Sequence, residues 1–224
     1  SLVRRSFSDP LGTYATNIMG TAHLLEATRR VPSVRAVVVV TSDKCYDNRG
    51  VQGQFREDDP MGGKDPYSSS KGCAELLTAA YRSSFFTDDT LIASARAGNV
   101  IGGGDWSEDR LIPDIVKAID ADRPIVLRNP KSTRPWQHVL EPLRGYLALG
   151  SRLLAGDKTC AEGWNFGPNS GDAISVSNLT EKIVTLWGKG HIEINHNSDA
   201  LTEAIFLDLD SSKAADELGF EPAI

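Results

Sequence analysis

The feature that most constrains the fold is a valine-rich run at residues 34–41, which reads VRAVVVVT. A nearly continuous run of β-branched residues, with no polar alternation, is typical of a strand buried on both faces of a parallel sheet. Residues 91–97 predict a second strand, and each of the two follows a segment with helical spacing. The order helix, strand, helix, strand predicts an α/β fold with a parallel sheet and right-handed crossovers.

The two predicted helices share one start signal, an aspartate followed by proline at residues 9–10 and 65–66. Aspartate caps a helix N-terminus and proline fits its first turn, so we expect helices over residues 10–30 and 66–85. Beyond Trp106 the predicted elements are shorter. The helices expected there cover residues 111–121, 141–154, 176–187 and 211–218. The strands expected there cover residues 124–127, 164–166, 192–194 and 206–209.

Composition excludes several classes of protein. The 224 residues are 40% hydrophobic and 24% charged, as in an ordinary globular protein. The net charge of −6 and the lack of a Lys/Arg cluster argue against a nucleic-acid-binding surface. The longest apolar run, residues 36–40, is far shorter than the roughly 18 residues of a membrane span. We therefore expect neither a nucleic-acid nor a membrane partner.

The cysteines and histidines predict neither a disulfide framework nor a metal site. The three cysteines form no CxxC pair and cannot all pair with one another, which favours a reducing cytoplasm. The four histidines form no HExxH motif and have no cysteine partner at zinc spacing. We expect a cytoplasmic protein without a metal.

Tyr67 and Lys71 lie one helical turn apart, so their side chains share a face of the predicted helix. A free tyrosine, with a pKa of about 10, is a poor base at neutral pH. A nearby ammonium group favours the phenolate, and the pair can then exchange a proton with a substrate hydroxyl. By itself, a YxxxK pair also occurs on ordinary half-exposed helix faces.

A second polar group, Thr41, Ser42, Asp43 and Lys44, follows the strand at residues 34–41. In open α/β sheets, ligands bind at the carboxyl ends of the strands. There a hydroxyl can bind a substrate oxygen, an aspartate can supply a proton, and a desolvated lysine can act as a base. The alternative is a plain polar turn after a strand.

The chain as a whole resembles the extended short-chain dehydrogenase/reductase family. The matching segments, in order, are TNIMGT, VVVVTSDKCYDN, DPYSSSKGCAE, RAGNVIGGGDW, RPWQHVLEP, WNFGPN and DLDSSKAADELGF. Within this family the nucleotide-sugar 4,6-dehydratases are the most similar, and overall likeness favours CDP-glucose as the substrate. The resemblance implies a Rossmann-type domain that holds NAD and a lobe that holds the nucleotide sugar.

The resemblance also implies a hydro-lyase reaction. Tyr67, assisted by Lys71 and Ser42, takes the proton of the sugar 4-hydroxyl while C4 gives a hydride to NAD. Water then leaves across C5 and C6, and the hydride returns to C6. Relatives that act on other nucleotide sugars have Asp-Glu after the strand, where this chain has Asp43 and Lys44. Asp43 is the expected acid, and Lys44 the expected C5 base if its proton is lost.

Binding residues follow from the same resemblance. Expected contacts of NAD are Asn17, Thr41, Tyr67 and Lys71, although a mid-helix asparagine such as Asn17 usually faces solvent. Expected contacts of the nucleotide sugar are Asn99, Arg110, Arg134 and Asn165. Many relatives have an arginine just before the last strand, where this chain reads EAIF at residues 203–206. No readable contact therefore selects cytosine.

The family's glycine-rich NAD fingerprint does not occur here, so the resemblance places it upstream of residue 1. We expect residues 1–105 to be the remaining part of the NAD-binding Rossmann-type domain. Residues 106–224 are expected to form mainly the sugar-nucleotide lobe, interleaved with the first. The strand at residues 34–41 would then have an unpaired edge, and the chain alone would be unstable and nearly inactive. The resemblance also implies a homodimer through helices 10–30 and 66–85.

Two other functions remain open. A nucleotide-sugar 4-epimerase, or a dehydratase of another nucleotide hexose, would use the same scaffold. Epimerase relatives usually have small or apolar residues at Asp43 and Lys44, so a carboxylate there favours dehydration unless the two side chains simply pair with each other. A non-catalytic dinucleotide-binding regulator is expected to have lost Tyr67 or Lys71, and both are present.

Overall fold

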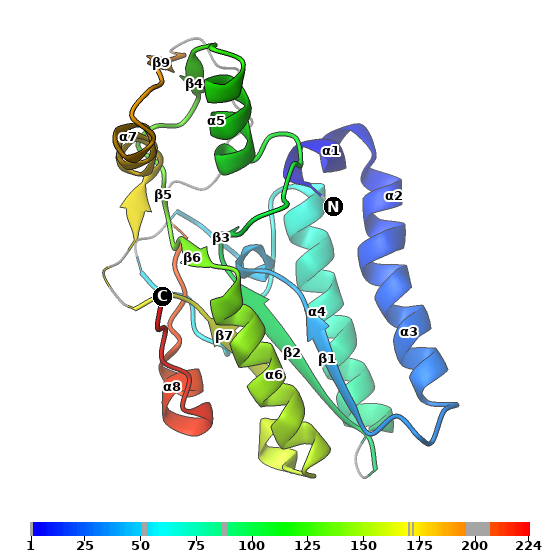
Figure 1. The fold of residues 1–224 in the computed structure, drawn as a ribbon. Helices are drawn as coiled ribbons and strands as arrows, with labels where there is room; N and C mark the ends of the chain where they lie inside the picture. Colours follow the sequence, from blue (N-terminus) through cyan, green and yellow to red (C-terminus); the bar gives the residue numbers. More distant parts are fainter. Residues whose placement is uncertain (1, 51–52, 87–88, 170, 172, 196–206) are drawn as a thin grey trace.

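The described part of the chain is organised around a parallel sheet (Figure 1). The computed structural model describes residues 2–50, 53–86, 89–169, 171, 173–195 and 207–224. Within them, three strands pair in the order β1-β2-β7, and both pairings are parallel. The bounds are β1 (Ala36–Val40), β2 (Leu91–Ala97) and β7 (Gly163–Phe166). The predicted α/β fold with a parallel sheet is confirmed.

The strands β1 and β2 differ in burial. β2 is central, and all its residues except Ala97 are buried. β1 lies at the edge of the described sheet, where Val39 is its buried residue and Val40 is 49% exposed. Both faces of β1 are covered, as expected, because its alternate residues pack against the cores on the two sides of the sheet. Its burial is less complete than that of β2, because no described strand lies beside its outer edge. The expected unpaired edge is present.

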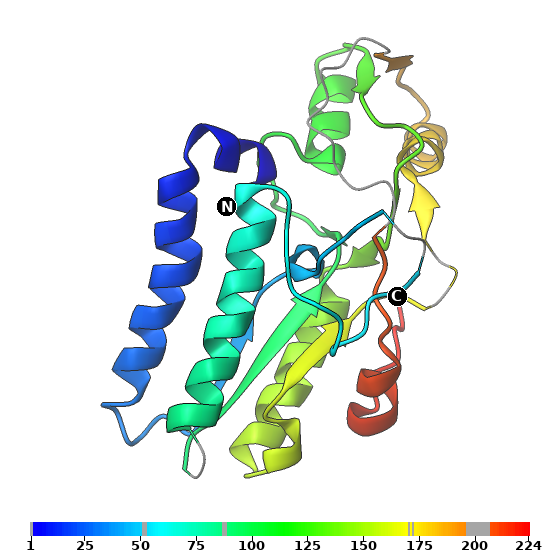
Figure 2. The same ribbon diagram turned by 180° about the vertical axis from the view of Figure 1, so that it is seen from behind.

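One face of the sheet is covered by α3 (Gly20–Thr28) and α4 (Pro66–Phe85), as Figures 1 and 2 show. Leu25, Val39, Phe86 and Ile92 form the core between these helices and the sheet. Helix α3 continues from α2 (Pro10–Tyr14) through the π-helical segment η1 (Ala15–Met19), and the short helix α1 (Val3–Ser8) precedes them and ends at Asp9.

Both predicted capping signals form. The Asp9 carboxylate accepts a hydrogen bond from the Gly12 backbone N–H, and Asp65 accepts one from the Ser68 N–H, each at 2.9 Å. These bonds satisfy backbone donors that a helix leaves free at its first turn. The helix predicted over residues 66–85 is confirmed.

The opposite face carries α6 (Leu140–Leu154) and α8 (Ser212–Leu218), with the short turn η3 (Lys158–Cys160) after α6. Leu149, Leu153, Trp164 and Phe166 belong to the apolar core between them and the sheet. Because α6, β7 and α8 return to the sheet, the chain beyond residue 105 contributes to both lobes.

A smaller lobe lies beyond the carboxyl ends of the strands, at the top of Figure 1. Its core contains Ile115, Ile119, Ile125 and Leu127, separate from the cores on the sheet. Its elements are α5 (Leu111–Asp120), β4 (Ile125–Leu127), β5 (Thr133–Arg134), β8 (Ile174–Ser175), α7 (Val176–Trp187) and β9 (Ile192–Ile194). β4 pairs with β9 in parallel, and β5 with β8 antiparallel.

Two short connections complete the fold. The turn η2 (Asp43–Cys45) follows β1, and β3 (Val100–Ile101) pairs with β6 (Gln137–His138) between the lobes. The strand predicted at 206–209 falls partly outside the described residues, and Leu209 makes a single bridge to Phe55. No helix in the described part of the chain is long and apolar enough to cross a membrane.

Candidate active site

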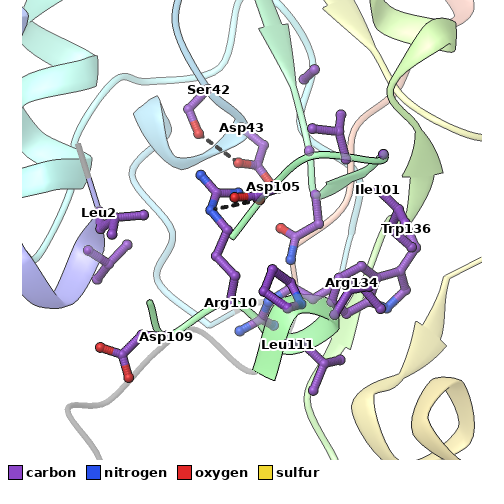
Figure 3. A pocket seen from close by; sticks show the side chains of 18 of the residues that line it. Leu2, Ser42, Asp43, Ile101, Asp105, Asp109, Arg110, Leu111, Arg134 and Trp136 are labelled. Carbon is purple, nitrogen blue, oxygen red and sulfur yellow. Dashed lines mark hydrogen bonds and ion pairs between the residues drawn. The ribbon is translucent and has the colours of Figure 1, made fainter. Parts of the chain in front are cut away.

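A cleft of about 580 Å³ opens between the sheet and the smaller lobe. One wall is the carboxyl end of β1 with the first turn of α4, and the other is the segment that leads from β3 into α5. This is the edge of a parallel sheet at which ligands bind, and the volume lies within the usual range for small-molecule sites. Figure 3 shows side chains that line the cleft.

Ser42 and Asp43 form a hydrogen-bonded pair where η2 turns the chain after β1. The Ser42 hydroxyl donates to Asp43 Oδ1 at 2.9 Å and accepts from the Lys44 backbone N–H at 3.2 Å. Asp43 is 1% exposed, and its Oδ2 atom has no hydrogen-bond partner among the described residues. Buried polar atoms nearly always have a hydrogen-bond partner, so this oxygen is a candidate for a reactive or ligand-binding atom.

Lys44 lines the same cleft and only partly neutralises Asp43. Its Nζ atom lies 3.5 Å from Asp43 Oδ1. That distance exceeds the roughly 2.7–2.9 Å of a strong charge-assisted hydrogen bond. The contact also involves the oxygen that Ser42 already binds. Pairing between Asp43 and Lys44 therefore leaves one carboxylate oxygen available.

Tyr67 and Lys71 are brought to this wall by α4. Tyr67 lies in the first helical turn and lines the cleft, and Lys71 lies one turn farther along the helix. The Lys71 ammonium donates to the backbone oxygen of Val40 at 3.4 Å, which places it at the carboxyl end of β1. Burial lowers the pKa of Lys71, and the Glu75 carboxylate partly opposes this shift. Lys71 thus lies one helical turn from Tyr67 with its ammonium group at the carboxyl end of β1.

Asn17 and Thr41 are both engaged inside the protein. Asn17 lies in the π-helical segment η1, and its Nδ2 donates to Ser70 Oγ at 2.8 Å. Segments of π-helix are frequent at functional sites. Thr41 lines the cleft, but its hydroxyl donates to the Glu75 carboxylate. Asn17 is not among the residues that line the cleft, so its described contact supports the Tyr67 helix.

Asn99, Arg110 and Arg134 line the cleft together. Arg110 is half-exposed, and its Nε atom lies 3.5 Å from Asp105 Oδ2. Arg134 is buried, and one of its guanidinium nitrogens donates to the Thr133 backbone oxygen at 2.8 Å. In Figure 3, Arg134 and Trp136 lie on another side of the cleft from Ser42 and Asp43. Three of the four expected substrate contacts are therefore assembled in one place.

Asn165 is placed elsewhere. It is fully buried in β7 and does not line the cleft. Its Oδ1 accepts from the Tyr46 hydroxyl at 2.7 Å, and its Nδ2 donates to the backbone oxygens of Phe55 and Asp210. These bonds engage both the oxygen and the nitrogen of its amide and join β7 to two loops. The segment 203–206, expected near the base, lies outside the described residues.

Sequence reasoning missed an ion pair beneath the site. Glu75 and Arg96 are buried and lie 2.8 Å apart, and Ser94 and Thr41 also donate to Glu75. Burial alone would raise the pKa of Glu75, but these hydrogen bonds outweigh it and hold that pKa below its usual range. The pairing joins α4 to β2 across long sequence distances, so no local pattern reveals it.

Tyr146 and Trp106 also line the cleft and were not identified as site residues. Tyr146 lies on α6 next to the buried face of that helix, which includes Gly145, Leu149 and Leu153. The apolar pattern of the helix therefore does not distinguish Tyr146 from a core residue. Trp106 follows the glycine-rich segment 102–104, and no local pattern marks it as a site residue. Among the described residues, no group of three or more His, Cys, Asp or Glu side chains could hold a metal ion.

Known proteins resemble this chain in sequence and in fold. A relative from Salmonella typhimurium, named CDP-glucose 4,6-dehydratase, is 51% identical over 227 residues. That alignment covers 99% of this chain and 63% of the relative, so the chain spans less than two thirds of that relative's length. A dTDP-glucose 4,6-dehydratase from Streptomyces griseus is 29% identical, with 100% of this chain and 65% of the relative covered.

Solved structures of other proteins have folds similar to that of this chain. A dTDP-glucose 4,6-dehydratase from Streptomyces venezuelae, solved with NAD bound, matches with a TM-score of 0.86 and 26% identity. The match covers 100% of this chain and 66% of that one. A UDP-glucuronic acid 4-epimerase from Bacillus cereus also has a TM-score of 0.86, but at 22% identity it shows the shared fold alone.

A family model described as GDP-mannose 4,6 dehydratase matches residues 1–224, the whole chain. The α/β fold, the cleft at the carboxyl end of its parallel strands and the matched relatives all agree with that model. The chain belongs to the GDP-mannose 4,6 dehydratase family.

Proposed function

We propose that the protein containing this chain is an NAD-dependent hydro-lyase that converts CDP-glucose to CDP-4-keto-6-deoxyglucose and water. The observation that carries the proposal is the buried Asp43 carboxyl group, which has an unpartnered oxygen in the same cleft as Tyr67. The choice of CDP-glucose is supported by the relative that is 51% identical and has that activity in its name. The cofactor is supported by the related dehydratase that was solved with NAD.

The described residues fit the reactive end of NAD. Lys71 presents a half-buried ammonium at the carboxyl end of β1, next to Tyr67, and Thr41 forms part of the same wall. Tyr67, Lys71 and Thr41 would hold that end, with Asn17 supporting α4 through Ser70. The chemistry that bound NAD supplies is reversible hydride transfer with sugar carbons C4 and C6.

Tyr67 begins the reaction as the base for the sugar 4-hydroxyl. The adjacent Lys71 charge stabilises the phenolate, which takes the hydroxyl proton as C4 becomes a ketone. Ser42 turns its hydroxyl, which donates to Asp43 Oδ1 in the structure, and donates to the same oxygen. The new ketone acidifies the proton on C5, which prepares the elimination.

Asp43 and Lys44 carry out the loss of water. Once its own proton is lost, Lys44 takes the C5 proton, and Asp43 in its protonated form gives a proton to the 6-hydroxyl, so that the C6–O bond breaks and water leaves. Atoms and charge balance, because one proton leaves C5 and one reaches the departing oxygen. Arg110 and Arg134 bind the diphosphate oxygens, for which a guanidinium fork is well suited, and Asn99 binds beside them.

The test uses protein expressed from the complete open reading frame that encodes this chain. It is incubated with NAD and CDP-, dTDP-, GDP- or UDP-glucose, and 4-keto-6-deoxy product is measured. We expect product from CDP-glucose, and a loss of about 10²- to 10⁴-fold in kcat for Tyr67→Phe, which removes the base. Asp43→Asn should slow water loss, because an amide cannot supply the proton.

The matched control is Tyr81→Phe, which removes a hydroxyl from the same helix α4 but outside the cleft. It should keep normal activity. An epimerised sugar without water loss would contradict the dehydration and favour the epimerase. Product from a different nucleotide hexose would correct the substrate, and bound NAD with no turnover would favour the regulator.

The proposal includes a homodimer through helices 10–30 and 66–85. It is supported by apolar side chains that the described structure leaves exposed on those helices, namely Leu11, Met19, Leu24, Leu76 and Phe85. Burying such side chains against a second copy removes apolar area from water. Light scattering should give twice the monomer mass, and Leu76→Glu should reduce it. A monomer at micromolar concentration would contradict this part.

A cytoplasmic location is also part of the proposal. It is supported by the three cysteines, which are all free thiols. Free thiols are usual in a reducing compartment. Fractionation of cells that express the complete protein, followed by detection with an antibody, would test the location.

A further inference from the structure

Tyr146 enters the cleft from α6, on the opposite side of the sheet from Tyr67. Its ring packs edge-on against Phe166, with centroids 5.5 Å apart and planes at 80°. Gly145 allows α6 to approach Phe166 closely enough for this packing, because a Cβ atom at Gly145 would lie 2.4 Å from the Phe166 ring. The phenol ring is therefore held by packing at a position where Tyr146 lines the cleft.

The Tyr146 hydroxyl has no hydrogen-bond partner among the described residues. Burial raises the pKa of this phenol, and the Asp43 carboxylate adds to the shift. A tyrosine that is largely buried usually finds a partner for its hydroxyl. Because this one lines an open cleft, its partner is expected to be a ligand.

Asp43 also has an atom that lacks a hydrogen-bond partner. Its Oδ1 atom accepts from Ser42 and contacts Lys44, whereas its Oδ2 atom has no partner in the described part of the chain. The lining of the cleft thus contains a packed phenol and a carboxyl group with one oxygen that lacks a hydrogen-bond partner. Both are neutral hydrogen-bond donors when Asp43 is protonated, so together they can bind one hydroxyl oxygen.

We propose that the Tyr146 hydroxyl binds the oxygen that leaves sugar carbon C6, beside Asp43. This inference rests on the dehydration proposed above and adds a residue to it. As the C6–O bond breaks, negative charge develops on the oxygen until the Asp43 proton arrives. The Tyr146 O–H donates a hydrogen bond to that oxygen throughout, keeps its own proton, and is unchanged when water departs.

The test compares two leaving groups in the protein from the complete open reading frame. CDP-glucose loses hydroxide, which needs a proton, whereas CDP-6-chloro-6-deoxyglucose loses chloride, which does not. After elimination, both yield the same 4-keto-6-deoxy product. In Tyr146→Phe, kcat with CDP-glucose should fall about ten- to hundredfold, with KM changed less than about twofold. With the chloro sugar, kcat should change less than about twofold.

The matched control is Tyr81→Phe, since Tyr81 also packs edge-on against a phenylalanine, Phe85, but does not line the cleft. It should leave both rates unchanged, and thermal unfolding should show that both variants are folded. An equal fall with the two substrates, or no fall with either, would overturn the inference for Tyr146. A wild-type enzyme that forms no product from CDP-glucose would instead overturn the proposed function.

Discussion

Two arginines near the cleft show how differently the same side chain can be used. Arg96 lies near the carboxyl end of β2, its side chain is 5% exposed, and it pairs with Glu75 at 2.8 Å. Arg110 lies on the rim with a side chain 45% exposed, and it contacts Asp105 at 3.5 Å. Arg96 also donates to the Tyr46 hydroxyl and the Glu57 backbone oxygen.

The two arginines differ in the free energy that is lost when their ion pairs are broken. A solvent-exposed ion pair contributes only about 0–1 kcal/mol, so Arg110 can exchange Asp105 for a diphosphate at little cost. Removing one partner of a buried pair leaves a charge without compensation and costs about 3–5 kcal/mol. The exposed arginine is thus available to a ligand, whereas the buried one holds α4 against β2.

The largest effect is expected for Arg96→Met. The protein from the complete open reading frame should lose about 3–5 kcal/mol of unfolding free energy, because Glu75 stays buried without its partner. Urea denaturation followed by circular dichroism measures this. Arg110→Met, the matched exposed change, should cost less than about 1 kcal/mol. Similar losses in the two variants would contradict the comparison.

A smaller effect is expected for Arg110→Met on substrate binding. Loss of a charge-assisted hydrogen bond of about 1.5–3 kcal/mol should raise KM for the nucleotide sugar at least about tenfold, with kcat nearly unchanged. Steady-state kinetics measures both. The control is Arg30→Met, which breaks an exposed pair with Glu26 on the far end of α3 and should not affect KM. If KM is unaffected in Arg110→Met, Arg110 does not bind the diphosphate.

The smallest effect concerns acid stability. The pKa of Glu75 is lower in the folded protein than in the unfolded chain, so the unfolded chain binds more protons as the pH falls. The stability that Glu75 contributes is present at neutral pH, above its unfolded pKa of about 4.3, and is lost as the pH falls through the folded value.

Ser94→Ala removes one hydrogen bond to the Glu75 carboxylate. It should cost about 1–2 kcal/mol at pH 7 and move the acid unfolding midpoint to a higher pH. Acid titration followed by circular dichroism measures the midpoint. Ser83→Ala, an exposed serine on the same helix α4 as Glu75, is the control. An unchanged midpoint in Ser94→Ala would show that Glu75 is not held in its charged form by this bond.

The sequence by itself determined the elements that depend on neighbouring residues. The capping aspartates, the helices at 66–85 and 176–187 and the strand at 91–97 all occur where predicted. The Tyr67–Lys71 spacing and the polar turn after β1 also follow from local geometry. Since helices and turns form through contacts within a few residues, their signals can be read along the chain.

Only the tertiary structure decided how those elements use their side chains. It leaves β1 at an open edge, although its sequence is that of a buried strand. It engages both the oxygen and the nitrogen of the Asn165 amide within the protein, and it brings Tyr146 from the opposite helix layer into the cleft with Asp43. These outcomes depend on residues about fifty to more than a hundred positions apart, and burial and hydrogen bonding at that range are set by packing rather than by any local pattern.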